Sequence, residues 1–340
     1  QHIKNHSTQN ARSAKQIRAD HRLVLTGTPM ENTVSDLWSI FDFLMPGYLG
    51  NHAHFRRNFE QPIGAGGLEA EACHARLHRK VHPFLLRRMK RDVAKELPDK
   101  IDRVAYCDMS PDQLRMYRRM LESSAQQLSE LVESQGFARS RFTVLKTLTR
   151  LRQICCHLDL LNGTDFKVTQ PSAKLDLLNE LIDEAMDSGH RVLLFSQFVS
   201  MLSILRRDLE QRKIPYCYLD GSTVKRLEEV HRFNNDESIP LFLISLKAGG
   251  TGLNLTGADM VIHYDPWWNP AVEDQATDRA HRIGQMRTVY NIKLITRNSI
   301  EEKVLALQEK KRTMIDATLQ VRKDLMGQLT WEDIKELLTI

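Results

Sequence analysis

Arg279 and Arg282 lie three residues apart in a charged segment, 273–282, whose pattern predicts a helix. Residues at this spacing share one face of a helix, so the two guanidinium groups are expected to lie close together. Such a pair suits a polyphosphate whose negative charge rises in a transition state. Taken alone, the segment also fits a surface helix with salt bridges, because Asp274 and Asp278 lie one helical turn apart and beside the arginines.

A glycine run precedes this segment. Gly249, Gly250 and Gly252 follow an apolar stretch, 241–245, that predicts a buried strand. Glycines after a strand allow backbone N–H groups to approach a phosphate or a nucleic-acid backbone closely. A second predicted strand, 260–264, follows the glycines. The order of strand, glycine turn, strand and charged helix therefore indicates phosphate chemistry.

Helices and strands alternate from residue 172 onward, which favours an open, mostly parallel sheet with right-handed crossovers. Sheets of this kind bind ligands at the carboxyl ends of their strands. Polar and glycine residues follow three of the predicted strands, namely Ser196-Gln197, Asp220 to Thr223, and Lys247 to Gly252. We therefore expect a site along one edge of the sheet.

Other segments carry weaker patterns. The sequence predicts a buried strand at 22–26, a strand with alternating character at 101–108, a flexible loop at 61–72, helices at 110–134 and 140–161, and a long charged helix at 300–323. Thr330 with Asp333 fits a capping box for a last short helix. The apolar stripe of the helix at 140–161 is expected to pack in a core.

Bulk properties exclude some classes of protein. The 340 residues carry a net charge of +5, which permits a nucleic-acid partner without arguing strongly for one. No apolar run is long enough for a membrane span, and no signal peptide is expected. The five cysteines form no CxxC pair. Cys155-Cys156-His157 is expected to supply core thiols and no metal site, since adjacent helical residues point in different directions.

The motifs resemble those of Swi/Snf-type DNA translocases, which belong to helicase superfamily two. The resemblance covers nearly the whole chain, in order. It rests on the late segments GGTGLNLTGAD, DPWWNP and DQATDRAHRIGQ, and on the earlier segments LTGTPMEN, DLWSIFDFLMPGYLG, PFLLRRMKRDV and VLLFSQF. The family usually has a proline after Cys-His, where this chain has Leu158, which affects only the expected local turn.

This resemblance implies a fold and a domain plan. We expect an α/β protein with a RecA-like parallel sheet flanked by helices, a helical insertion, and the tail of a first RecA-like lobe. The expected parts are residues 1–75 from the first, ATP-binding lobe, 76–171 as linker and helical protrusion, 172–298 as the second lobe, and 299–340 as a brace helix and cap.

The resemblance also implies roles at an ATP site. Arg279 and Arg282 are expected to be arginine fingers, with Arg282 favoured, and Gln275 is expected to hold nucleotide or couple the lobes. Gly250, Gly252 and Asp278 are expected at the ATP. No G-x-x-x-x-G-K-[ST] phosphate loop occurs in the sequence. ATP and Mg²⁺ are therefore expected to be held mainly by an upstream lobe, and QHIKN (1–5) resembles the sequence just after that lobe's acidic pair.

A second group of residues is expected to contact double-stranded DNA. It comprises Thr28, Arg87, Arg88, Ser196, Gln197, Ser222, Lys247, Gly249, Thr251, Trp267 and Trp268. Backbone contacts of this kind make binding salt-dependent but not sequence-specific. Two alternatives stay open: the basic segment 76–103 also fits a solvated surface, and the Trp pair also fits core packing with a lid.

The sequence is therefore interpreted as the C-terminal part of an ATP-dependent double-stranded DNA translocase, inactive by itself. A catalytically dead nucleic-acid-binding fragment and a superfamily-two RNA helicase are the alternatives. DPWWNP, the helical insertions and the HRIGQ ending count against the RNA helicase. The partners expected are duplex DNA, ATP and the upstream lobe, and no membrane. We expect a cytoplasmic protein on bacterial DNA, or a nuclear one in a eukaryote.

Overall fold

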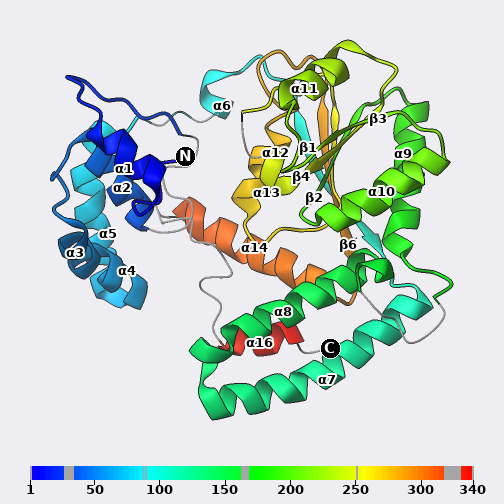
Figure 1. Ribbon diagram of the computed structural model, residues 1–340, viewed down its shortest axis with the longest axis horizontal. Helices are drawn as coiled ribbons and strands as arrows, with labels where there is room; N and C mark the ends of the chain where they lie inside the picture. Colours follow the sequence, from blue (N-terminus) through cyan, green and yellow to red (C-terminus); the bar gives the residue numbers. More distant parts are fainter. Residues whose placement is uncertain are drawn as a thin grey trace. The chain divides into compact units, whose positions relative to one another are not determined.

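The chain folds into two compact units in the computed structural model (Figure 1). One unit comprises residues 1–93 with 309–328, and the other comprises 94–308 with 329–340. The structure describes residues 2–26, 34–86, 88, 90–161, 168–249, 252–317 and 331–338, without the side chains of 91, 138 and 310–317.

A six-stranded parallel sheet forms the centre of the larger unit. The strands are β1 (Lys100–Cys107), β2 (Val192–Ser196), β3 (Tyr216–Leu219), β4 (Leu241–Ser245), β5 (Met260–His263) and β6 (Val289–Thr296). Their order is β1-β6-β5-β2-β4-β3, and every neighbouring pair is parallel. Every residue of β2 and β4 is buried, which explains why both read as continuous apolar runs. The predicted parallel α/β fold is confirmed.

Helices cover both faces of the sheet. Helices α9 (Ala173–Asp187) and α10 (Val199–Gln211) pack on one face, against side chains such as Leu194 and Leu243. Helices α11 (Arg226–Asn235) and α13 (Pro270–Thr277) pack on the other, against side chains such as Phe195 and Phe242. Because side chains alternate along a strand, consecutive residues of β2 and β4 belong to two separate cores.

Strand β1 comes from outside the predicted second lobe. All eight of its residues pair with β6, so the segment expected as linker and protrusion supplies an edge strand of the sheet. The sheet therefore extends beyond the predicted range 172–298. Pairing with β6 gives the backbone groups of β1 the partners that an isolated strand would lack.

Two long helices follow β1 and form a hairpin. Helix α7 (Pro111–Gln135) begins with a capping box made by Ser110 and Gln113, and α8 (Phe137–Cys156) follows a turn at Gly136, where φ is 78°. Both predicted helices are confirmed. Helix α8 ends five residues earlier than the predicted 161, because the backbone at His157 is extended, and a 3₁₀ turn, η3 (Leu158–Leu160), follows. Cys155 and Cys156 are completely buried, as expected for core thiols.

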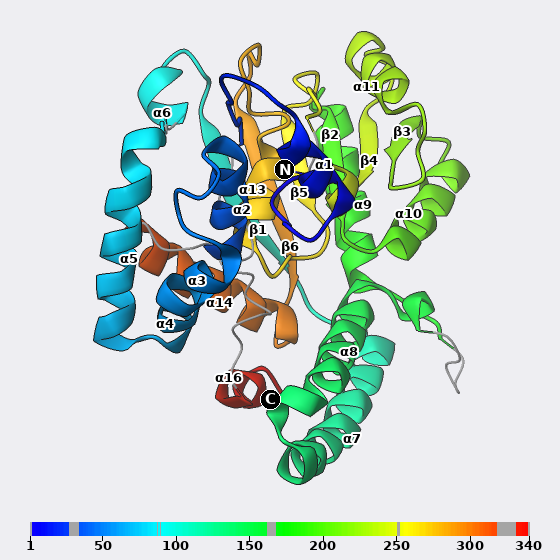
Figure 2. The same cartoon turned by 60° about the vertical axis from the view of Figure 1, so that its left-hand side comes forward.

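The C-terminal helices attach to this hairpin and to the sheet. Helix α14 (Ile300–Ala317) begins at β6, and α16 (Trp331–Leu338) lies beside α7 and α8 (Figure 2), where the rings of Phe137 and Trp331 are 6.1 Å apart. Lys174 on α9 forms a fully buried ion pair with Glu301. The predicted cap residue Thr330 and the predicted helix beyond residue 317 lie outside the described residues.

The smaller unit is helical in its described part. It contains α1 (Gln9–Gln16), α2 (Val34–Leu44), α3 (His52–Phe55), the π-helix η1 (Arg56–Glu60), α4 (Gln61–Ala65), α5 (Gly67–Val81), the 3₁₀ turn η2 (His82–Phe84) and α6 (Lys90–Val93). An apolar cluster joins α2, η1 and α5 through residues such as Trp38, Phe59 and Leu77.

Two predictions for this unit are wrong. Residues 22–26 form no strand, and Leu23 and Leu25 are 79% and 82% exposed, because no neighbouring strand pairs with them in the described part of the unit. The predicted flexible loop at 61–72 is instead helical on both sides of Gly66, which has a φ of 80°. Ile63, Ala70 and Cys73 are buried, and this burial outweighs the low helix propensity of the glycines.

Candidate functional site

The predicted motif residues gather at one edge of the sheet. Ser196 ends β2, Asp220 follows β3, Leu246 follows β4, and Tyr264 follows β5. Since all the strands are parallel, these positions lie at the carboxyl ends of four neighbouring strands. The edge expected from the sequence is therefore where the structure brings these residues together, and we call it the carboxyl rim.

Arg279 and Arg282 attach to the loop that follows β4. The Arg279 Nε donates to the carbonyl oxygen of Gly249 at 3.0 Å, and the Arg282 Nη1 donates to that of Leu253 at 3.3 Å. The Leu255 N–H in turn donates to the Arg279 carbonyl at 3.0 Å. These bonds hold both arginines against one loop.

The helix expected over 273–282 is shorter than predicted. Helix α13 ends at Thr277, and Arg279 and Arg282 lie in the turns that follow, not on one helical face. The chain tightens here, because the N–H groups of Arg279 and Ala280 donate to carbonyls only three residues back. Gln275 on α13 and Asp278 at its end are both half-buried.

The two arginines differ in exposure. Arg279 is 8% exposed, whereas Arg282 is more accessible to solvent. Burial, reinforced by the nearby Arg282 charge, lowers the pKa of the Arg279 guanidinium from its usual very high value. An arginine stays charged under such a shift, so the rim carries two positive charges within one turn of chain.

Gly249 lies where a side chain would collide with the core. A Cβ at this position would lie 2.7 Å from the Phe195 Cε1 and 3.3 Å from the Ile244 Cγ2. The glycine therefore lets the loop pass directly over the end of β2. Gly252 has a φ of 50°, and Lys247 is exposed. Gly250 and Thr251, which were expected at ATP and DNA, lie outside the described residues.

Asp265 organises the ends of β2 and β5. Its carboxylate accepts a hydrogen bond from the Ser196 hydroxyl at 2.5 Å and from the Gln197 N–H at 3.3 Å. Burial raises the pKa of Asp265 to about 6, although Arg152 and the Ser196 hydroxyl favour its ionised form. Ser196 is buried, and its hydroxyl is used for this bond. The Gln197 side-chain N–H₂ has no partner among the described residues.

Arg152 of helix α8 is a site residue that no sequence motif identified. It is 1% exposed, its Nη2 is 3.5 Å from the Asp265 Oδ2, and it donates to the Pro266 carbonyl oxygen. Its guanidinium lies 5.4 to 6.0 Å from the ring centres of Phe198, Trp267 and Trp268. The available signal was its position four residues after Leu148, within the apolar stripe of α8.

The Trp pair divides between two environments. Trp268 is 2% exposed, so its ring belongs to the interior and cannot stack on a base in this conformation. Trp267 is half-buried, and its backbone N–H donates to the Glu273 Oε1 at 2.5 Å. Gln308 of α14 donates to the Trp267 carbonyl and accepts from Lys293 at 3.0 Å. For Trp268 the structure supports the core alternative over a DNA contact.

The turn after β3 is a compact hydrogen-bonded unit. The Asp220 Oδ1 accepts from the Ser222 hydroxyl at 2.6 Å and from the Ser222 N–H at 2.8 Å. Hydrogen bonds led by the Ser222 hydroxyl lower the pKa of Asp220 to about 2. Ser222 is exposed, so its outer surface faces solvent while its donors are used within the turn.

Three predicted DNA contacts, Thr28, Arg87 and Arg88, fall within the sequence range of the smaller unit. Thr28 and Arg87 fall on positions that the structure does not describe. Arg88 is exposed in the smaller unit. Of the predicted site residues, the structure thus gathers Ser196, Gln197, Ser222, Lys247, Gly249, Gly252, Trp267, Gln275, Asp278, Arg279 and Arg282 around the carboxyl rim.

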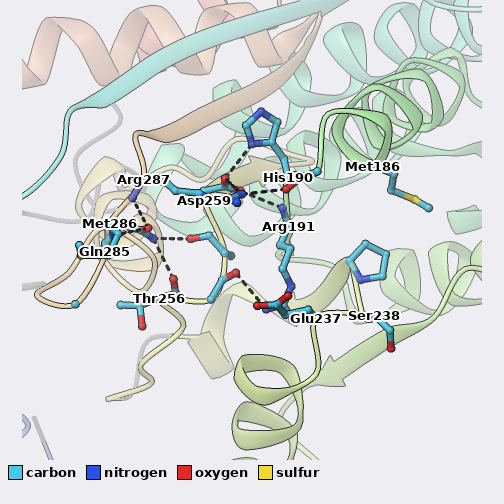
Figure 3. Close-up of a pocket in the computed structure, with 15 residues that line it drawn as sticks. Met186, His190, Arg191, Glu237, Ser238, Thr256, Asp259, Gln285, Met286 and Arg287 are labelled. Atoms are coloured by element: carbon cyan, nitrogen blue, oxygen red, sulfur yellow. Dashed lines mark hydrogen bonds and ion pairs between the residues drawn. The ribbon is translucent and has the colours of Figure 1, made fainter.

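A cavity of about 460 Å³ opens at the opposite, amino-terminal edge of the sheet (Figure 3). Asp259 accepts from His190 at 2.9 Å and from Arg287 at 3.2 Å there. Burial opposes ionisation, but bonds from His190, the Arg191 N–H and Arg287 keep the pKa of Asp259 below its usual value. Gln285 donates to the carbonyls of Thr256, Ala258 and Ala280. The bonds of Gln285 hold the segment after Arg282, and the cavity is separate from the carboxyl rim.

Two further features bear on the class of site. No group of three or more His, Cys, Asp or Glu side chains that could hold a metal ion occurs among the described residues. Within the same residues, no helix is long and apolar enough to cross a membrane. The carboxyl rim is thus characterised by arginine, glycine, hydroxyl and amide groups.

Comparison with protein families gives two adjoining matches. Residues 1–160 match the SNF2-related domain, and residues 173–284 match the helicase conserved C-terminal domain. The two matches together span most of the chain and end at residue 284.

Curated relatives match over nearly the whole chain. A putative ATP-dependent helicase/translocase of Bacillus subtilis is 39% identical over 100% of this chain and 37% of its own length. The TATA-binding protein-associated factor 172 of Homo sapiens is 36% identical over 99% of this chain and 21% of its own length. The chain therefore spans only about a fifth to two fifths of the length of these relatives.

Solved structures give the same result. The Sulfolobus solfataricus SWI2/SNF2 ATPase core in complex with dsDNA is 36% identical, with a TM-score of 0.58 over 99% of this chain and 70% of that one. The C-terminal domain of the same ATPase matches with 31% identity and a TM-score of 0.56, over 71% of this chain and 100% of that one. The parallel sheet described here therefore matches the RecA-like architecture of those proteins.

Proposed function

This chain belongs to the SWI2/SNF2 family of ATPases, and we propose that it is part of an ATP-dependent translocase that moves along double-stranded DNA. The carboxyl rim would supply one half of the ATP site and part of the DNA track. The observation that carries this proposal is the attachment of Arg279 and Arg282 to the carbonyls of Gly249 and Leu253, which holds two cations against one loop at the rim.

The arginines suit the charge that builds up on a transferring phosphoryl group. In such reactions the protein acts mainly by positioning and by electrostatic stabilisation. Arg282 is the stronger candidate for the finger, because it is the more accessible and makes one weak bond to Leu253. Arg279 is 8% exposed, and we assign it to holding the loop and to supporting Arg282. Gln275 and Asp278 lie on the adjoining helix end and are proposed to orient the nucleotide or couple the lobes.

The ATP itself would be held mainly by another lobe. These 340 residues contain no phosphate-loop sequence, and the relatives are much longer than this chain. The arginine N–H donors at the rim fit an anion such as the triphosphate of ATP. When bound, ATP would supply the phosphoryl group. At the rim, the Asp265 carboxylate is bound to Arg152 and Ser196, and the Asp220 carboxylate accepts from Ser222. We therefore assign the Mg²⁺ ligands to the other lobe as well.

DNA contact is proposed for the outer surface of the same rim. Lys247 and Ser222 are exposed there, and Gln197 is half-buried. One solved relative is described as an ATPase core in complex with dsDNA, which supports duplex DNA as the partner. Such contacts to phosphates bind without reading sequence.

The test is ATP hydrolysis by a polypeptide that joins these 340 residues to a phosphate-loop lobe. Duplex DNA is expected to stimulate turnover, and Arg282→Ala is expected to lower kcat by about 10³- to 10⁵-fold. Arg287→Ala is the matched control, because it removes an exposed arginine bound at the opposite edge of the sheet. Arg287→Ala should change turnover by less than about threefold. Circular dichroism should show that Arg282→Ala is still folded.

Two results would replace this proposal with another function. Turnover that is absent, or indifferent to DNA and to Arg282, would indicate a nucleic-acid-binding relative without catalysis. Stimulation by duplex RNA in preference to duplex DNA, in a direct competition, would indicate an RNA helicase.

A further inference from the structure

The smaller unit contains a basic pocket that the proposed function does not use. Its volume is about 260 Å³, and it lies between the turn at Tyr48–Gly50, helix α3 with the π-helix η1, and helix α5. His54, Arg76 and Lys80 contribute its basic groups. None of the described residues that line it carries a carboxylate, so the pocket presents cations and polar groups.

The positive charges of Arg76 and Lys80 repel each other. Arg76 and Lys80 are four residues apart on α5 and therefore face the same side of the helix. Like charges at this spacing repel each other and destabilise an isolated helix. No carboxylate in the described part of the chain forms an ion pair with either side chain. An anion in the pocket would relieve this repulsion.

The local sequence fixes the orientation of Arg76. Pro62 has no N–H, so the carbonyl of Asn58 cannot accept the usual helical bond from a residue four positions later. That carbonyl instead accepts from the Arg76 Nη2 at 2.9 Å, while the guanidinium lies 4.9 Å from the Phe59 ring centre. The side chain is therefore pre-organised, with its remaining N–H groups available to a ligand.

The other wall of the pocket depends on a glycine. Gly50 has a φ of 76°, and a Cβ on it would lie 2.8 Å from the His54 ring. The absence of that Cβ lets the imidazole lie against the turn. The Tyr48 hydroxyl donates to the Lys80 carbonyl at 3.0 Å, and the Lys80 Nζ lies 5.8 Å from the Tyr48 ring centre. Turn and helix are thus bound together around the cations.

We propose that this pocket is a binding site for a phosphate group, held by Arg76, Lys80 and His54. A π-helix at its wall is consistent with this assignment, since such distortions occur frequently at functional sites. The phosphate belongs either to a DNA backbone or to a free phosphorylated molecule. The site is independent of the ATP and DNA contacts assigned to the carboxyl rim.

Isothermal titration calorimetry of the full 340-residue chain with inorganic phosphate tests the site. Arg76→Gln and Lys80→Gln are each expected to weaken binding about tenfold or more, because each removes a charge-assisted hydrogen bond. Arg79→Gln is the matched control: it removes the same charge from an exposed position on the same helix, outside the pocket. The control should bind within about twofold of the unsubstituted chain.

The source of the phosphate is separated by a second measurement. Fluorescence anisotropy with a duplex lacking terminal phosphates gives the salt dependence of DNA binding. If the ligand is the DNA backbone, the double variant Arg76→Gln/Lys80→Gln should lower the slope of log K against log salt by about 1. If the ligand is a free phosphorylated molecule, the slope stays unchanged while phosphate binding is still weakened.

The proposal is overturned if phosphate binds the Arg76 and Lys80 variants as tightly as it binds the unsubstituted chain. It is also overturned if Arg79→Gln weakens binding as much as they do, because the effect would then be one of general surface charge. Since Arg76 also bonds to Asn58, circular dichroism of each variant is compared, and Lys80→Gln alone decides the outcome if Arg76→Gln unfolds.

Discussion

At the scale of single residues, the most informative feature is a buried charge. Arg152 is almost completely enclosed, yet it is bonded to Asp265 and Pro266 and surrounded by three aromatic rings. A charge is retained in such a place only when it is paired and hydrogen-bonded. This one connects helix α8 to the segment after β5 and, through Asp265, to Ser196 and Gln197 at the rim.

Removing that charge should be costly. We expect Arg152→Ala to lower the free energy of unfolding by about 3–5 kcal/mol, because Asp265 would be left buried and unpaired. Urea unfolding followed by tryptophan fluorescence measures the loss directly, since Trp267 and Trp268 flank the guanidinium.

A control and a double variant make this prediction specific. Arg150→Ala removes an exposed arginine from the same helix and should cost less than about 0.5 kcal/mol. Arg152→Met combined with Asp265→Asn should recover part of the stability, because neither partner then remains as an isolated charge. Equal losses in the free energy of unfolding for Arg150→Ala and Arg152→Ala would show that the Arg152–Asp265 pair does not stabilise the fold.

At the scale of elements, the connections after the strands position the site. The loop after β4 crosses the end of β2 at Gly249, where Phe195 leaves no room for a side chain. Helix α13 ends early, and the turns that follow carry Arg279 back to the Gly249 carbonyl. The positions of the arginines are thus set by this loop and not by helical periodicity.

Gly249→Ala should therefore affect both stability and function. The added Cβ must displace Phe195 or Ile244, both of them buried, and such overpacking costs about 1–3 kcal/mol. The Gly249 carbonyl also holds Arg279. We therefore expect DNA-stimulated ATP hydrolysis to fall as well, when it is measured on the polypeptide that joins these residues to a phosphate-loop lobe. Denaturant midpoints and turnover rates measure the two effects.

Gly221→Ala is the matched comparison for this substitution. Gly221 lies at the same rim, and a Cβ added there would meet no atom within 4 Å. The free energy of unfolding of Gly221→Ala should therefore stay within about 0.5 kcal/mol of that of the unsubstituted chain. An unchanged midpoint for Gly249→Ala would contradict the close packing described here.

At the scale of the whole molecule, the larger unit is assembled from segments far apart in the sequence. Strand β1 pairs with β6, although much of the chain separates them. The buried pair of Lys174 and Glu301 joins α9 to the start of α14, and the Tyr117 hydroxyl accepts from the Ile300 N–H at 2.8 Å. The hairpin α7–α8, the sheet and the start of α14 therefore form one packed body.

The chain alone is expected to be catalytically silent. With no phosphate loop among its 340 residues, it should show no multiple-turnover ATP hydrolysis, with or without duplex DNA. A phosphate-release assay measures this, and the polypeptide joined to a phosphate-loop lobe serves as the positive control. Sustained turnover by the pure chain would contradict the assignment of half an ATP site.

The sequence determined much of this molecule because some patterns depend only on local geometry. Continuous apolar runs predicted the buried strands β2 and β4, and Ser110 with Pro111 marked the start of α7. Strand ends followed by glycine, hydroxyl and amide groups predicted the carboxyl rim. The motifs were sufficient to indicate the family, and the comparisons confirm it.

The tertiary structure alone decided which distant groups meet. No local pattern indicates that Arg152 pairs with Asp265 across 113 positions, or that β1 completes the sheet. Residues 22–26 have the composition of a strand but form none here, because a strand needs neighbours to satisfy its backbone groups. The two arginines predicted to share a helix face lie instead in turns, where the Gly249 and Leu253 carbonyls accept from their guanidinium groups. Propensity acts within a few residues, whereas burial and charge pairing are settled only when the whole chain has packed.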